Sequence, residues 1–128
     1  MAGYLCVRQL SFGYLDMMWH TKPASEISDI RTLERAVFDT VEVLPVVPGT
    51  CMSPTFGHLF SGGYAAGYYG YKWAEMLEAD AFALFKETGV MNKETAKRYL
   101  ETILSKCGSV DAMEMFVNFR GREPKIDA

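Results

Sequence analysis

One short stretch, HLFSGGYAAGYYGYKW at residues 58–73, combines a histidine with four tyrosines and four glycines. A phenol hydroxyl can donate a hydrogen bond to a carbonyl oxygen, or to the negative charge that develops on that oxygen during a reaction. Glycine permits backbone turns that other residues avoid, and it lets another chain approach the backbone closely. The combination favours a surface that binds a peptide or another carbonyl-containing ligand.

The stretch is predicted to lie at the start of a long helix over residues 62–88, which ends at Gly89. At about 100° per residue, Tyr64, Tyr68 and Tyr71 share one face of that helix. The opposite face is expected to contact the core and carries Ala66, Gly70, Trp73, Leu77, Ala81 and Leu84. The tyrosine face can also be an amphipathic rim, whose rings pack while their hydroxyls stay in water. Spacing alone leaves both interpretations open.

The elements around this helix are also predicted to be helical, so the expected fold class is all-α and bundle-like. Apolar residues recur at helical spacing, and no strand pattern competes. Further helices are expected at residues 3–19, 28–40 and 92–107, with a shorter one beginning near Ser109. Ser28 or Asp29 can cap the second helix, and Asn92 can cap the fourth. Residues 3–19 are apolar on most sides, which predicts deep burial.

Acidic residues outside the tyrosine face are expected to be structural or solvated. Asp16 lies within an apolar helix, and a buried carboxylate needs a partner, so we predict a structural hydrogen-bond acceptor. Glu75, Glu78 and Asp80 are predicted to form a solvated helix face. The polar tail, GREPKIDA, is predicted to fray.

The composition limits the classes of partner. The 128 residues are 49% hydrophobic and 23% charged, with a net charge of −3, which is typical of a globular protein. Lys and Arg form no basic run, so no nucleic-acid partner is expected. No apolar run of about 18 residues exists, so no membrane span is expected. The start lacks a signal-peptide pattern, and Cys6, Cys51 and Cys107 are far apart, which together predict a cytoplasmic protein with reduced thiols.

The segment FGHLFSGGYAAGYYGYKWAEMLEADAFALF resembles the C-terminal part of the catalytic domain in the M3 family of zinc oligopeptidases. VRQLSFGYLDMMWH near the start and DAMEMFVNFRGREPKIDA at the end resemble the same family, so the resemblance covers nearly the whole chain. The bacterial peptidyl-dipeptidase branch is the most similar. The resemblance implies that residues 1–128 belong to the catalytic domain of a larger, mostly helical enzyme that cuts short peptides.

The resemblance also implies residue roles. The implied substrate-facing residues are His58, Tyr64, Tyr68 and Tyr71, and the implied loop glycines are Gly62, Gly63 and Gly67. Tyr71 is the first choice for stabilising the oxyanion of the tetrahedral intermediate, with His58 as the second catalytic residue. Tyr64 is expected to contact a substrate carbonyl, and the glycines are expected to form a mobile loop over the substrate.

Zinc is implied by the family but not by the residues of this chain. Family members hold zinc with the two histidines of HExxH and a downstream glutamate, and the glutamate of HExxH acts as general base. This sequence has no HExxH, and its histidines are His20, expected at a helix end, and His58. We therefore expect the zinc ligands in sequence outside these residues, in a longer protein or a broken gene. The chain alone is expected to bind no zinc and to hydrolyse nothing.

Three functions are consistent with the sequence. The first is a peptidase segment, whose partners are a short peptide and the missing zinc-bearing portion of the catalytic domain. The second is a stand-alone helical peptide-binding module without catalysis, whose affinity Tyr64→Phe or Tyr71→Phe would weaken. The third is an interaction piece that forms homo-oligomers through exposed apolar helix faces.

Overall fold

The computed structural model describes residues 1–126, and the described residues form helices and irregular segments with no strand, as the all-α prediction requires. The chain divides into two compact units, Met1–Lys72 and Trp73–Ala128, and the division falls inside the helix α3 (Gly70–Thr88). Within residues 1–126, no helix has the length and apolar character needed to cross a bilayer.

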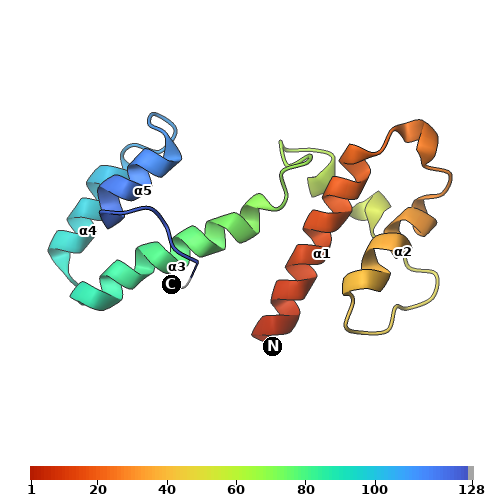
Figure 1. The fold of residues 1–128 in the computed structure, drawn as a ribbon, viewed down its shortest axis with the longest axis horizontal. Coiled ribbons are helices and arrows are strands. Elements are labelled where there is room, and N and C mark those ends of the chain that lie inside the picture. Colours follow the sequence, from red (N-terminus) through yellow and green to blue (C-terminus); the bar gives the residue numbers. More distant parts are fainter. Residues whose placement is uncertain (127–128) are drawn as a thin grey trace. The chain divides into compact units, whose positions relative to one another are not determined.

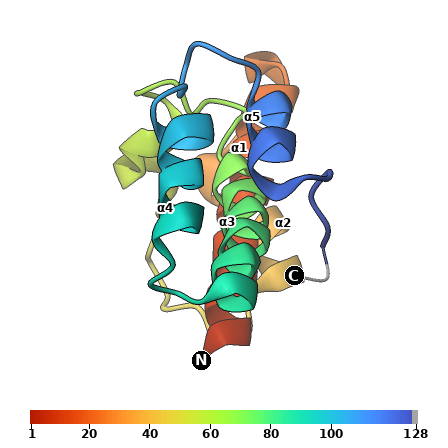
Figure 2. The same cartoon turned by 90° about the vertical axis from the view of Figure 1, so that its left-hand side faces the viewer.

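The first unit contains two long helices, α1 (Ala2–Thr21) and α2 (Ile30–Val41), which lie side by side (Figures 1 and 2). Short 3₁₀ turns follow each of them, at Ala24–Glu26, Ser53–Thr55 and Gly57–Leu59. The predicted limits of both helices are confirmed to within two residues. Asp29 is the N-cap of α2, because its carboxylate accepts a 2.7 Å hydrogen bond from the backbone N–H of Thr32.

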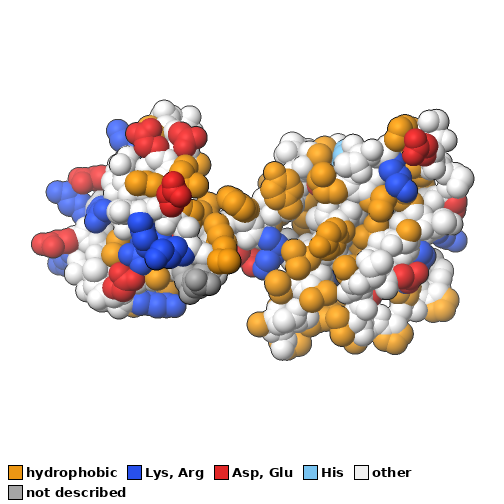
Figure 3. Space-filling view, viewed as in Figure 1, with side chains coloured by type: hydrophobic (Ala, Val, Ile, Leu, Met, Phe, Trp, Pro, Cys, Tyr) orange, Lys and Arg blue, Asp and Glu red, His pale blue; other side chains and the backbone are white. Residues whose placement is uncertain are grey.

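The core of the first unit joins both helices to the segment that carries the tyrosines. Its buried members are Phe12, Leu15, Val37, Phe38, Leu59 and Tyr68. Deep burial of α1 on most sides is not observed, because Leu5 and Leu10 are 55% and 41% exposed. Many hydrophobic side chains lie on the visible face of this unit (Figure 3). Within the first unit, the core residues Phe12 and Leu15 bury one side of α1.

The prediction of a helix over residues 62–88 is wrong at its start, because α3 begins at Gly70. Gly62, Gly63 and Ala66 have left-handed backbones, with φ of +78°, +81° and +54°. A right-handed helix cannot pass through such residues, so the chain forms turns there. The predicted helical faces therefore fail for Tyr64 and for the apolar residues before Gly70. Trp73, which was placed on the core face, is 56% exposed.

The second unit packs α4 (Lys93–Tyr99), a π-helical turn (Leu100–Leu104) and α5 (Ala112–Arg120) around the rest of α3 (Figures 1 and 2). Three rings hold these helices together: Tyr99 lies edge-on to Phe85 at 5.8 Å and edge-on to Phe119 at 5.1 Å. Asn92 caps α4, as predicted, by accepting hydrogen bonds from two backbone N–H groups. The last helix begins three residues later than predicted, because the N-cap is Asp111.

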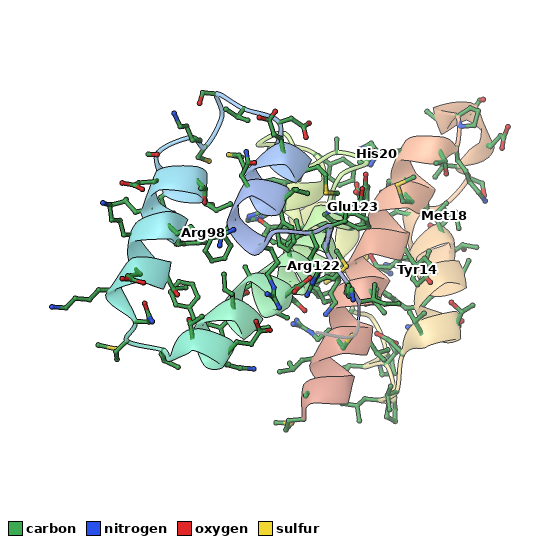
Figure 4. All side chains as sticks on the ribbon, turned by 60° about the vertical axis from the view of Figure 1, so that its left-hand side comes forward. Tyr14, Met18, His20, Arg98, Arg122 and Glu123 are labelled. Atoms are coloured by element: carbon green, nitrogen blue, oxygen red, sulfur yellow. The ribbon has the colours of Figure 1, made fainter. Side chains whose placement is uncertain are left out.

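Asp80 is not on a solvated face but is fully buried in the second unit. Both of its oxygens accept 2.6 Å hydrogen bonds from Arg122, and Oδ1 accepts a 3.1 Å bond from Arg120. The backbone N–H of Lys125 donates to Oδ2 at 2.8 Å, and Arg120 also pairs with Glu87. The predicted fraying of the tail is therefore wrong through Lys125, since this part of the tail is tied to α3. Figure 4 labels Arg122 in the segment after α5.

Replacing Asp80 with Asn removes the charge that Arg120 and Arg122 share. Removing one partner from a buried ion pair typically costs about 3 kcal/mol or more of unfolding free energy. We expect the second unit of Asp80→Asn to unfold at lower urea concentration, measured from the amide NMR signal of Phe119. Glu78→Gln, on the exposed side of the same helix, is the matched control. Equal shifts in the two variants would contradict a special contribution from Asp80.

The same carboxylate should make stability depend on acid pH. The Arg122 hydrogen bonds, followed by burial acting in the opposite direction and then by Lys125 and Arg120, hold the pKa of Asp80 well below its ordinary value of 3.8. A depressed folded-state pKa gives stabilisation that is complete above about pH 4 and is lost as the pH falls toward the folded-state value. Urea titrations of Phe119 below and above that pH should show this loss in the natural chain and a weaker loss in Asp80→Asn.

Candidate functional site

Four rings of the Gly/Tyr-rich stretch lie next to one another in the first unit: His58, Tyr64, Tyr68 and Tyr71, called here the ring cluster. The ring centroids of His58 and Tyr64 are 5.4 Å apart. Tyr64 and Tyr71 are stacked at 5.4 Å, and Tyr68 and Tyr71 lie 4.9 Å apart. All four predicted substrate-facing residues are thus brought together, but by turns and ring stacking rather than by one helical face.

The ring cluster runs from the core to the surface. Tyr68 is only 9% exposed and lies edge-on to Phe56 at 5.3 Å and to Phe12 at 6.0 Å. Tyr64 is half-buried, whereas His58 is exposed and Tyr71 is 37% exposed. The cluster therefore has a packed base and an accessible edge, and the accessible edge carries a phenol and an imidazole.

The electrostatic setting keeps Tyr71 protonated. A hydrogen bond with the Tyr64 side chain, with smaller effects from burial and the neighbouring phenols, raises the pKa of Tyr71 above its ordinary value of 10.0. A phenol with a raised pKa holds its proton throughout the neutral range. A phenol has one O–H donor, so Tyr71 can donate to a ligand at the exposed edge of the ring cluster only in place of its bond with Tyr64.

The backbone conformation requires glycine at some positions of the stretch and not at others. Gly62 and Gly63 have the left-handed backbone that glycine adopts without strain. Gly67 has no positive φ, and a Cβ atom there would meet the Tyr64 carbonyl oxygen at an ordinary contact distance of 3.6 Å. The left-handed residue that the sequence pattern missed is Ala66. The sequence carries no signal for it, because alanine favours ordinary helical backbone.

Two buried carboxylates hold the loops that build this region. The first is Asp16, which accepts the backbone N–H groups of Ala66 and Tyr68 and so confirms the predicted structural acceptor. The second is Glu34, which the sequence analysis missed. Its partners lie in a loop that is distant in sequence, so helical spacing gives no signal for it.

Glu34 fixes the loop that leads into the His58 turn. Its carboxylate accepts the backbone N–H groups of Met52 at 2.8 Å and Ser53 at 2.7 Å, together with the Ser53 hydroxyl at 2.6 Å. Burial raises the pKa of Glu34, but the bonds from Ser53 and Met52 outweigh it, so the net pKa lies below the ordinary value. The Trp19 indole N–H in turn donates to the Ser53 hydroxyl at 3.1 Å. This loop is therefore held by both α1 and α2.

Cys51 is a free thiol next to Glu34. Its Sγ donates to Glu34 at 3.6 Å, and burial followed by the Glu34 charge raises the pKa of the thiol. A thiol whose pKa is raised is a poor nucleophile and a poor metal ligand at neutral pH.

The described residues do not offer a zinc site. Across residues 1–126, His, Cys, Asp and Glu side chains form no group of three or more that could hold a metal ion. The ring of His58 faces Phe56 and Tyr64 rather than further ligands. Zinc therefore does not fit the donor groups of this part of the chain.

One hollow of the first unit lies away from the ring cluster. A cavity of about 530 Å³ opens between α1, α2 and the connection 41–55, and none of the four cluster rings lines it. Among its charged lining groups, Arg35 contacts Glu42, Glu34 accepts hydrogen bonds from the loop at Met52, and Arg8 lies over the ring of Phe12. Size alone does not make this hollow the functional site.

Comparison with known proteins identifies relatives along the whole chain. The model of Peptidase family M3 matches residues 1–128. The chain is 44% identical over 128 residues to Oligopeptidase A of Haemophilus influenzae, an alignment that covers 99% of this chain and 19% of that protein. It is 43% identical over 128 residues to "Probable cytosolic oligopeptidase A" of Arabidopsis thaliana, covering 96% of this chain and 18% of that protein.

Dipeptidyl carboxypeptidase of Escherichia coli is 40% identical over 126 residues, covering 97% of this chain and 18% of that protein. These identities do not support the expectation that the peptidyl-dipeptidase branch is more similar than oligopeptidase A. The chain spans about a fifth of the length of the curated relatives it matches.

Gly63→Ala tests whether the turn before Tyr64 needs a left-handed residue. Alanine at a left-handed φ typically costs about 1 kcal/mol, so we expect a lower unfolding free energy for the first unit. Gly57→Ala is the control, because Gly57 has no positive φ and a Cβ there would lie 3.9 Å from its nearest neighbour. Both can be measured by urea unfolding followed by the near-UV circular dichroism of the tyrosines. An equal loss in the two variants would show that the left-handed turn is not the cause.

Proposed function

The chain belongs to peptidase family M3, and on that premise we propose that residues 1–128 form the C-terminal part of the catalytic domain of a zinc metallopeptidase that cleaves short peptides. The observation that carries this proposal is the ring cluster, in which a protonated phenol and an imidazole share an exposed edge. Its role is to bind the peptide and to stabilise charge, rather than to supply the metal.

Tyr71 is the proposed oxyanion donor. Attack on a peptide carbonyl moves negative charge onto its oxygen, and a preorganised hydroxyl donor lowers the energy of that state. Tyr71 carries its proton at neutral pH, as a phenol of ordinary pKa does, and the raised pKa does not change this. Stacking on Tyr64 and packing against Tyr68 limit the movement of the ring, so little reorganisation is needed when charge develops.

The other cluster residues are proposed to hold the substrate. Tyr64 contacts a substrate carbonyl, and His58 serves as the second catalytic residue through its ring nitrogens, which can donate or accept a hydrogen bond. Tyr68 supports the other rings from the core, because its own side chain is almost fully buried. The backbone of the bound peptide is proposed to lie close to the loop glycines Gly62, Gly63 and Gly67.

Zinc is proposed to be bound by residues outside this chain. M3 peptidases are zinc-dependent in general, and the described residues do not fit a zinc site. The proposed partners are therefore the remaining, zinc-bearing portion of the catalytic domain and a short peptide substrate. The chain alone is proposed to be inactive.

The cytoplasm is the proposed location of the longer protein. One Arabidopsis thaliana relative is called a probable cytosolic oligopeptidase A, and another is called an organellar oligopeptidase A, chloroplastic/mitochondrial. An organelle is therefore the alternative location.

A helical module that binds peptides or self-associates without catalysis is the second candidate function. The observation that favours it is the exposed apolar surface of α1, where Leu5 and Leu10 lie open to solvent.

Tyr71→Phe in the longer protein that contains this chain tests the proposed donor. Loss of one oxyanion donor typically lowers kcat about 10²–10³-fold, and KM for a short fluorogenic peptide should change little. Tyr69→Phe is the matched control, because Tyr69 lies in the same stretch, is 59% exposed and is not part of the ring cluster. Equal activity of Tyr71→Phe and the natural protein would refute the donor role.

The 128-residue chain by itself separates the two candidate functions. It should cleave no peptide with or without added zinc. Peptide affinity of this chain that Tyr64→Phe weakens, together with an absence of cleavage by the longer protein, would favour the binding module instead.

A further inference from the structure

Asp16 carries its carboxylate among apolar core residues, which cannot hydrogen-bond to it. It is fully buried on the face of α1 that also carries Leu15 and Phe12 of the core. A buried carboxylate is stable only when its oxygens are hydrogen-bonded. Oδ1 accepts the backbone N–H of Ala66 at 3.0 Å, and Oδ2 accepts that of Tyr68 at 2.9 Å. Both donors lie about fifty residues away along the chain.

His20 completes this arrangement from the last turn of α1. Its Nδ1 lies 2.8 Å from Asp16 Oδ1 and 2.8 Å from the Asp16 carbonyl oxygen. The ring is also 5.8 Å from the ring of Phe60, at the start of the turn segment. Figure 4 labels His20 on this helix. His20 thus contacts the Asp16 carboxylate from the same helix, at the oxygen that also accepts from Ala66.

The two donors, Ala66 and Tyr68, lie in a turn segment whose backbone has few hydrogen-bond partners of its own. Residues 60–69 form turns, so they lack the repeating hydrogen bonds of a helix. Ala66 has φ of +54°, a conformation that is unfavourable for a residue with a Cβ atom. The bonds to Asp16 begin at Ala66 and end at Tyr68. They therefore hold the backbone in a conformation that its own residues do not favour.

The position of this backbone decides where the tyrosines lie. Tyr68 belongs to the bonded segment, and Gly67 inside it donates its N–H to the Tyr64 carbonyl at 2.9 Å. Tyr71 contacts the rings of both Tyr64 and Tyr68. We propose that Asp16 is the positioning residue of the ring cluster: its carboxylate orders the backbone at residues 66–68 and thereby orients Tyr64, Tyr68 and Tyr71.

The catalytic consequence rests on the proposed function, whereas the ordering itself does not. Asp16 touches no substrate in this assignment and acts only through the backbone. A donor that is displaced by about 1 Å can lose much of its effect on rate, so an intact Tyr71 would be insufficient without Asp16.

Hydrogen exchange of the natural 128-residue chain tests the ordering without any substitution. The backbone N–H groups of Ala66 and Tyr68, measured by NMR, should exchange at least about tenfold more slowly than in an unstructured peptide of the same sequence. Exchange of both groups at the unstructured rate would overturn the proposal.

Asp16→Asn then tests whether the carboxylate is the cause. The amide keeps one acceptor oxygen but turns an N–H donor toward a backbone donor, so exchange at Ala66 and Tyr68 should accelerate about tenfold or more. The near-UV circular dichroism of the stacked tyrosines should fall with it.

Glu34→Gln is the matched control, because Glu34 is also a buried carboxylate that accepts two backbone N–H groups in the same unit. It should accelerate exchange at Met52 and Ser53 and leave Ala66 and Tyr68 within about twofold of the natural chain. Equal acceleration of Ala66 and Tyr68 in both variants would mean general loosening and would overturn the assignment to Asp16.

The longer protein separates this proposal from the proposed function. If it cleaves peptides, Asp16→Asn should lower kcat about 10–100-fold with a smaller change in KM, while the zinc content stays unchanged. Unchanged kcat alongside accelerated exchange would overturn the positioning role. If the natural protein cleaves no peptide, the proposed function fails, and the exchange measurements still decide whether Asp16 orders the tyrosine segment.

Discussion

The hydrogen bonds from the backbone of residues 66–68 to the buried carboxylate of Asp16 are the contact on which the ring cluster depends. The main-chain N–H groups of an irregular segment can be buried only when an acceptor pairs with them. A carboxylate is the strongest such acceptor, because the bond is charge-assisted. Asp16 is buried next to Leu15, so losing these hydrogen bonds would leave the carboxylate or the backbone N–H groups without a partner, which costs free energy.

The same arrangement recurs twice elsewhere in the chain. Glu34 on α2 holds the loop at Met52 and Ser53, and Asp80 on α3 holds the segment that contains Arg122 and Lys125. In each case a helix supplies the acid and a later irregular segment supplies donors, and at Asp80 the helix α5 adds a further donor from Arg120. Irregular segments in both units are thus fixed by a small number of side chains.

How much of this could be predicted depends on how local the signal is. The limits of α1 and α2 and the caps Asp29 and Asn92 follow from spacing and capping within a few residues, and these predictions are confirmed. Asp16 was recognisable as a structural acceptor because a charge within an apolar helix needs a partner. The identity of the partner was not predictable, because the donors lie about fifty residues away.

The errors have physical causes of the same kind. The helix predicted from residue 62 assumed right-handed backbone throughout, and Ala66 gives no sequence sign that it is left-handed. The proximity of Tyr64 and Tyr71 was nevertheless anticipated, although stacking across a turn produces it rather than helical periodicity. Asp80 was assigned to solvent because spacing along its own helix does not reveal its partners, which are Arg120 in α5 and Arg122 in the segment expected to fray.

The division of the chain into two units, each with its own core, bears on what is meant by its stability. Two cores can melt at different denaturant concentrations, so a single two-state free energy does not describe the whole chain. The two tryptophans fall one in each unit, and their surroundings differ. Trp19 is half-buried and hydrogen-bonded to Ser53, whereas Trp73 is 56% exposed. Indole fluorescence therefore responds mainly to unfolding of the unit that carries the ring cluster. A transition followed by that signal alone would not report unfolding of the other unit.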